Sequence, residues 1–205
     1  MFIILKHKCI KITSAIYRQN ISIYRQNIGK YSFPERGCPV PQILILGNDI
    51  RAQNDIFRYF SKKDAVIIMG ESVYSYGSKH LIVFNPKHYH TNKSRGVLLF
   101  LNDNIPIMPN FSAEGFIALC GSQNKKALEF LMKKNISTIT CGMMSTDTIT
   151  FSSLEKNSRQ ISLQRSIKTI DDSIAEAGDF KSVYSSNYPL SELFLTAFEI
   201  MLNLH

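Results

Sequence analysis

Two adjoining segments, IALCGSQNKKALEFL at residues 117–131 and ISTITCG at residues 136–142, predict a strand, a polar turn, a short helix, a second strand and a glycine turn. Cys120 and Cys141 stand at the ends of the two apolar runs, where a cysteine usually serves as a small buried hydrophobic residue. Strands joined by a helix in this way are typical of a layered α/β domain with parallel strands.

The same alternation extends toward the N-terminus. Residues 42–47 form a continuous apolar run that ends in glycine, as expected for a buried parallel strand, and residues 49–60 have the apolar spacing of a short helix. Further apolar runs predict strands at residues 65–69, 81–84, 96–101 and 115–119. Residues 70–79, rich in Gly, Ser and Tyr, are expected to be a loop.

Beyond residue 142 the pattern changes. Polar and apolar residues alternate over 148–152, 160–164 and 166–170, which predicts half-exposed antiparallel strands, and Pro189 begins a mostly apolar helix that runs to residue 203. We therefore expect an α/β fold: a mostly parallel sheet with flanking helices, in Rossmann-like or P-loop-like layers, plus a C-terminal antiparallel extension and a final helix.

The basic charge of the chain is concentrated at its start. Residues 1–40 carry a net charge of +6 out of +8, and they contain the repeat IYRQNI at residues 16–21 and 23–28, which indicates a local duplication or a short amphipathic helix. We expect a basic leader over 1–40 and an α/β domain over 41–205. Because the domain is nearly neutral, nucleic-acid binding is not expected.

Compartment and membrane association follow from the cysteines and the apolar runs. The four cysteines form no CxxC pair, which favours a reducing compartment, and no apolar run is long enough for a signal peptide or a membrane helix. We therefore expect a cytoplasmic protein without membrane contact.

The loops after the predicted strands are where a parallel sheet binds ligands. The loop at residues 47–52 lacks the second Gly, the Lys and the hydroxyl residue of a phosphate loop, and Arg51 is its cation. Glu71, Tyr74 and Tyr76 are candidate ligand contacts in the next loop, with a solvated crossover as the alternative. His88 and His90 could share a metal, but no further ligand accompanies them, so we predict no metal site.

Taken in order, these segments resemble the central domain of the Mur ligases, the ATP-dependent amino-acid-adding enzymes of peptidoglycan synthesis. The strand, turn and helix around CGSQN at residues 120–124 and the strand ending in TCG at 140–142 are similar to that family, as are the later strands and the helix from Pro189. The resemblance implies that Gly47 and Arg51 occupy the place of the nucleotide loop, with Arg51 replacing its Lys. It also implies that Glu71 corresponds to a glutamate linked to Mg²⁺ and His88 to a metal-associated histidine.

The departures from that family concern its chemistry. The catalytic Lys and hydroxyl are absent, the acidic turn is replaced at Ser122 and Gln123, and the segment from Gly47 to Glu71 is short. We therefore expect a non-catalytic or weakly nucleotide-binding Mur-ligase-like module without catalytic residues, possible ligands being ATP with Mg²⁺ or a UDP-linked small molecule of cell-wall precursor metabolism. The alternatives are an ATP-dependent amide-bond-forming ligase that uses Arg51, Glu71 and His88, and a structural or protein-interaction module with an unknown partner.

Overall fold

The computed structural model describes residues 10–11, 41–70, 72–86, 95–104, 115–155, 158–182 and 184–204. The expected repeat at residues 16–28 lies outside them, as does most of the expected basic leader. The elements in chain order are β1 (Ile10–Lys11), β2 (Gln42–Leu46), α2 (Ile50–Phe60), β3 (Ala65–Met69), β4 (Ser72–Ser75), β5 (His80–Phe84), β6 (Gly96–Phe100), β7 (Phe116–Gly121), α3 (Lys125–Lys133), β8 (Thr138–Cys141), β9 (Ile149–Glu155), β10 (Ser158–Leu163), β11 (Ile167–Lys168), β12 (Ile174–Ala175), β13 (Gly178–Lys181) and α4 (Pro189–Leu202).

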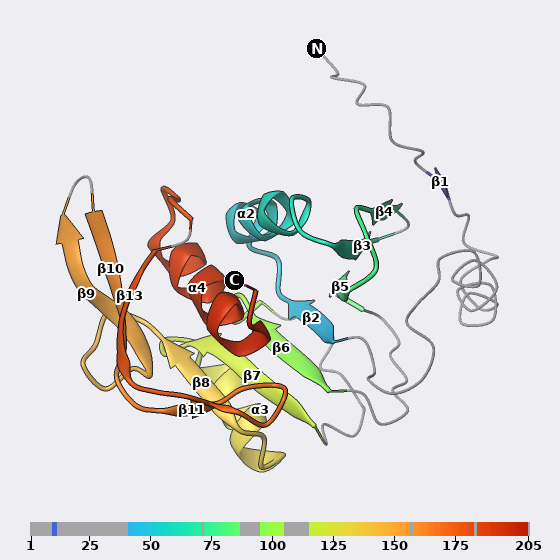
Figure 1. Cartoon of the computed structure of the whole chain (residues 1–205). Coiled ribbons are helices and arrows are strands. Elements are labelled where there is room, and N and C mark those ends of the chain that lie inside the picture. Colours follow the sequence, from blue (N-terminus) through green and yellow to red (C-terminus); the bar gives the residue numbers. More distant parts are fainter. Residues whose placement is uncertain are drawn as a thin grey trace.

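A large, mostly parallel sheet forms the centre of the protein, which confirms the expected α/β class (Figure 1). The described strands of this sheet follow the order β1-β4-β3-β5-β2-β6-β7-β8-β9-β10-β13. The strands from β3 to β9 in that order are parallel to one another, and their apolar runs are buried because both faces of the sheet are covered.

The helices cover the two faces unequally. Helices α2 and α4 pack on one face, where their apolar side chains share a core with Ile43, Val97 and Leu119 (Figure 1). Helix α3 packs on the other face, where Ala127 and Leu131 share a second core with the central strands. The described helices include none that is long and apolar enough to cross a membrane.

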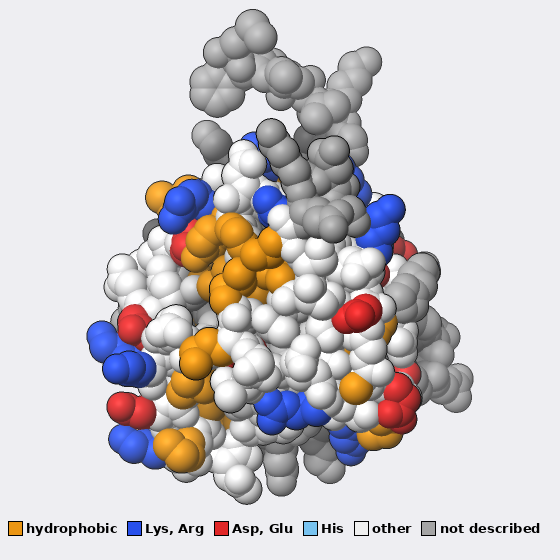
Figure 2. All heavy atoms as spheres, turned by 90° about the vertical axis from the view of Figure 1, so that its left-hand side faces the viewer, with side chains coloured by type: hydrophobic (Ala, Val, Ile, Leu, Met, Phe, Trp, Pro, Cys, Tyr) orange, Lys and Arg blue, Asp and Glu red, His pale blue; other side chains and the backbone are white. Residues whose placement is uncertain are grey.

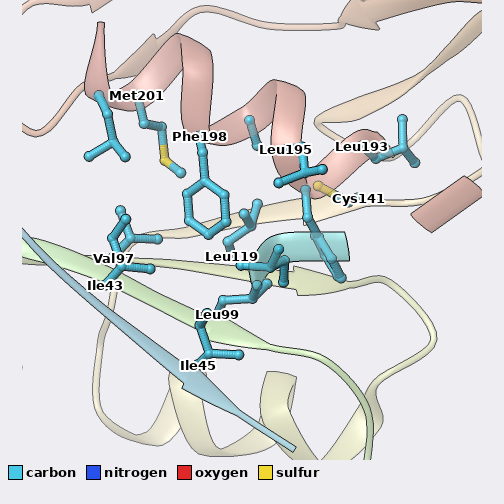
Figure 3. Close-up of a cluster of buried hydrophobic side chains, with 14 of the residues drawn as sticks. Ile43, Ile45, Val97, Leu99, Leu119, Cys141, Leu193, Leu195, Phe198 and Met201 are labelled. Carbon is cyan, nitrogen blue, oxygen red and sulfur yellow. The ribbon is translucent and has the colours of Figure 1, made fainter. Parts of the chain in front are cut away.

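Helix α4 closes the larger core. Its side chains Leu195, Phe198 and Met201 point toward the sheet, opposite β2, β6 and β7 (Figure 3). Of its 14 residues 12 are buried, because α2 packs against the side of α4 that the sheet does not cover. Burial on several sides explains why the sequence of this helix is apolar around most of its circumference.

The antiparallel extension is confirmed in outline and differs in detail. Strand β9 pairs with β10, and β10 pairs with β13, all antiparallel. The third predicted strand, at residues 166–170, does not join this sheet, because β11 pairs with β12 in a separate two-stranded sheet. Strand β13 takes the place beside β10 although its sequence, GDFK, has little apolar alternation.

Residues 70–79 are not the open loop that their composition predicts. Strand β4 folds back on β3 as an antiparallel hairpin, with Ile67 opposite Tyr74 and Ile68 opposite Val73. The ring of Tyr74 packs edge-on against Phe57 of α2 with a centroid distance of 5.0 Å, and Tyr76 contacts the same ring at 6.5 Å. These two tyrosines, expected as ligand contacts, therefore help to attach the hairpin to α2.

The two described cysteines are buried thiols, as expected from the sequence. Desolvation raises the pKa of Cys120 to about 12 and also raises that of Cys141. At pH 8 a pKa of about 12 leaves roughly one Cys120 thiol in 10,000 as the reactive thiolate.

We therefore predict that Cys120 and Cys141 are inert to a thiol reagent such as Ellman's reagent in the native protein. In a Cys9→Ser/Cys38→Ser variant, native protein at pH 8 should release almost no chromophore within minutes, and unfolding in guanidinium should expose two thiols. Adding Ser152→Cys to that variant supplies an exposed control thiol, because Ser152 is exposed on β9. Rapid native labelling of the variant without the control thiol would contradict the predicted burial.

Candidate functional site

Two of the sequence-predicted site residues, Gly47 and Arg51, follow the carboxyl end of β2 in the centre of the sheet. Strand β2 pairs with β5 on one side and with β6 on the other, so the chain that leaves β2 runs between two neighbours. Helix α2, after β2, covers one face of the sheet, and α3, after β7, covers the other face. In open α/β sheets, ligands bind at the carboxyl ends where the connections change direction in this way.

The turn after β2 is closed by hydrogen bonds from within the protein. Gly47 has a φ of +113°, and a Cβ there would lie 2.8 Å from Asn102 Oδ1, so both the backbone angle and the space require glycine. The Gly47 N–H donates to Asn85 Oδ1 at 2.9 Å, and its carbonyl accepts from Asn85 Nδ2 at 3.1 Å and from Gln53 Nε2 at 2.6 Å. Both backbone polar groups of Gly47 therefore already have partners.

The N-terminus of α2 is capped by an acid. The Asp49 Oδ1 atom accepts the N–H of Arg51 at 3.0 Å and the N–H of Ala52 at 3.2 Å. These are the groups that a phosphate would use at a helix N-terminus, where the positive end of the helix dipole also favours an anion. A carboxylate of the protein therefore already accepts the N–H groups that an anion at this helix N-terminus would use.

Arg51 is directed to an aromatic ring. Its guanidinium carbon lies 4.9 Å from the centre of the Tyr188 ring, a cation–π distance. The pKa of Tyr188 is raised, first by desolvation and then by its interactions with Asp49, to which it is hydrogen-bonded. We refer to Asp49, Arg51 and Tyr188 as the Asp49 cluster.

The other two predicted site residues, Glu71 and His88, lie outside the described residues, so their distances from Gly47 and Arg51 stay untested. The described part of the same loop contributes Asn85, which adopts a left-handed φ of 45° and bridges to Gly47 and Asn48. Within the described ranges, no three His, Cys, Asp or Glu side chains are grouped so that they could hold a metal ion.

A second polar group lies after β7 and β8, where sequence reasoning identified only the loss of an acidic turn. Asn124 caps α3 through a bond from the Ala127 N–H to Oδ1 at 3.0 Å, and it is 5% exposed. Asp147 is 1% exposed and accepts the Met144 N–H at 2.9 Å. A Cβ on Gly142 would lie 2.3 Å from Asp147 Oδ2 and 2.5 Å from Ser122 Oγ, so a buried carboxylate lies close to the Ser122 turn.

Sequence reasoning missed Tyr188 and Asp147 for different reasons. Tyr188 directly precedes Pro189, so the sequence indicated only that a helix begins there. Asp147 follows two exposed methionines in a turn, which is where an acid is normally solvated. Tyr188 lies against Arg51, and Asp147 lies close to Ser122; both neighbours are far away in the sequence.

The surface near these loops is mixed in character. Ile50 is 71% exposed at the start of α2, and Met143 is 60% exposed after β8. Figure 2, which shows the left-hand side of Figure 1, has hydrophobic side chains gathered in a patch, with lysine, arginine and acidic side chains scattered around it. The charges seen on this face do not form a continuous basic surface.

No protein-family model matches this chain, and no curated protein matches it significantly.

Proposed function

We propose that this chain is a Mur-ligase-like module that has lost ligase chemistry, with the Rossmann-like layering of that family's central domain. The order of β7, α3 and β8, followed by an antiparallel hairpin and the buried helix α4, supports this proposal. The split of α2 and α3 between the two faces of the sheet also supports it.

The observation that carries the proposal is the Asp49 cluster. An ATP-dependent ligase needs free backbone N–H groups and a cation at the phosphates, because charge develops there in the transition state. In this chain Asp49 holds the N–H groups of Arg51 and Ala52, and the Arg51 side chain lies over Tyr188. Losing one such stabilising contact typically costs about 10²–10³ in rate, and here the carboxylate adds repulsion.

The first test concerns turnover. With Mg²⁺, ATP and a UDP-linked carboxylic acid as phosphoryl acceptor in a single-turnover assay, we expect no ADP or acyl phosphate above background, since Asp49 already accepts the N–H groups that a phosphate would need. The readout is the chromatographic yield of ADP from labelled ATP. ADP formation that disappears in Arg51→Ala would overturn the proposal in favour of an ATP-dependent ligase.

The second test removes the blocking charge. Asp49→Ser keeps a helix-capping hydroxyl and eliminates the carboxylate, so we expect it to bind Mg²⁺-ATP at least about tenfold more tightly than the native chain. Asp103→Ser is the matched control, because Asp103 is an exposed acid after β6 that accepts the Lys126 N–H at the start of α3. Isothermal titration measures both variants, and equal affinities would show that Asp49 does not exclude phosphate.

A further inference from the structure

The two ends of the large sheet are protected in different ways. Strand β13 forms one edge, where Asp179 and Lys181 are exposed. Charged side chains on an edge strand discourage pairing with another chain, because an edge presents unpaired N–H and C=O groups. The charged residues of β13 therefore disfavour pairing of this edge with another chain.

Strand β4, at the opposite side, lacks such protection in its own residues. Its sequence, Ser72-Val73-Tyr74-Ser75, contains no charged residue and no proline, and Val and Tyr favour extended backbone. The strand is held in place on its inner side by four residue pairs with β3 and by the contact of Tyr74 with Phe57. A firmly held, uncharged edge of this kind is suited to accept another strand.

A segment near the start of the chain lies along this edge. Strand β1 pairs antiparallel with β4, with Ile10 opposite Val73 and Lys11 opposite Ser72. The 29 residues between Lys11 and Pro41 can span up to about 100 Å when extended. A connection of that length lets β1 reach β4 of its own chain, and loop-closure entropy rises only slowly with length.

We propose that Ile10–Lys11 acts as an edge-capping strand, which occupies β4 of its own chain and prevents that edge from pairing with β4 of a second copy. Two β4 strands can pair antiparallel about a two-fold axis, because such an interface uses the same patch on both subunits. Backbone hydrogen bonds would hold that dimer, as in other cases of strand addition to a sheet edge.

The test uses the full chain with prolines in β1. Ile10→Pro/Lys11→Pro removes both N–H groups of β1 and should prevent its pairing. Gln19→Pro/Asn20→Pro is the matched control, because it places two prolines in the N-terminal 40 residues outside β1. At a concentration where every variant is monomeric, we expect hydrogen exchange of residues 72–75 to become at least tenfold faster in the first variant only. At higher concentrations, sedimentation should show dimers of that variant only.

A third variant tests the edge itself. Ser75 is exposed, and Ser75→Lys in the double-proline background adds a charge to β4, so the dimers should disappear while exchange stays fast. A native chain that is dimeric and becomes monomeric with the prolines would show pairing between chains and overturn capping within one chain. Unchanged exchange, or faster exchange without dimers, would also overturn the proposal.

Discussion

Arg159→Leu is expected to lower the free energy of unfolding by about 3 kcal/mol, because it leaves a buried carboxylate without its counter-charge. Glu192 on α4 is fully buried, and its Oε1 atom accepts from Arg159 Nη1 at 2.5 Å and from the Ser186 N–H at 2.6 Å. Arg159 also donates to the Ser186 carbonyl at 3.0 Å. For a chain of this length the loss corresponds to roughly 6–12 °C in Tm, measurable by thermal and urea unfolding.

Two further variants separate the buried charge from general damage to the surface. Arg165→Leu removes an exposed arginine that donates to the Thr146 carbonyl at 2.6 Å, so it should cost less than about 1 kcal/mol. Adding Glu192→Gln to Arg159→Leu should recover stability, because the amide keeps an acceptor for Ser186 without the charge. Equal losses in Arg159→Leu and Arg165→Leu, or no recovery in the double variant, would contradict this account.

Arg159→Leu should also disturb the candidate site, because the hydrogen bonds of Glu192 and Ser186 join α4 to the segment that carries Tyr188. The Ser186 hydroxyl donates to Asp55 Oδ2 of α2 at 2.5 Å, and it accepts the Tyr188 N–H at 2.9 Å. Glu192 holds the backbone N–H of the same serine. The Asp49 cluster therefore depends on the ion pair between the partly exposed Arg159 and the buried Glu192, which lies outside the cluster.

The parallel strands were predictable because their environment imposes a simple rule. A strand covered on both faces must be apolar throughout, and β2, β6 and β7 each appear as a short uninterrupted apolar run. Turn glycines and Pro189 mark the ends of elements for local reasons of backbone geometry. Strand β4 was not predicted, because its serines and tyrosine are typical of loops. Its extended structure depends on pairing with β3, which its composition does not indicate.

The candidate site was predictable only in part. Gly47 and Arg51 were located because they follow an apolar strand, but the partners that determine their roles come from distant segments: Asn85 bonds Gly47, and Tyr188 lies against Arg51. The same limit applies to Glu199, which appears as a polar position in an apolar helix. Its partners Tyr59 and Lys63 are on α2 or follow it. Long-range contacts of this kind leave no local pattern.

Phe198→Ala is expected to lower the free energy of unfolding by about 3–5 kcal/mol, because it removes a large side chain from the centre of the main core. Phe198 is fully buried, points from α4 toward the sheet (Figure 3) and contacts the Phe60 ring at 5.5 Å. Phe130→Ala is the matched control on the other face, where Phe130 is half-buried and its ring lies 6.1 Å from that of Phe100. Because less apolar surface is lost there, we expect the smaller decrease for Phe130→Ala.

The urea unfolding curves of Phe198→Ala show whether α4 unfolds together with the rest of the domain or separately from it. Helix α4 packs against both the sheet and α2, and its Glu199 is hydrogen-bonded to Tyr59 and Lys63. Detachment of α4 would therefore expose apolar surface on the sheet and on α2. Urea unfolding of Phe198→Ala followed by circular dichroism and by tyrosine fluorescence should therefore give coincident curves. If the fluorescence of Phe198→Ala changed at a lower urea concentration while its circular dichroism kept the midpoint of the native chain, α4 would detach alone. The Asp49 cluster, which includes Tyr188 at the start of α4, would then open before the domain unfolds.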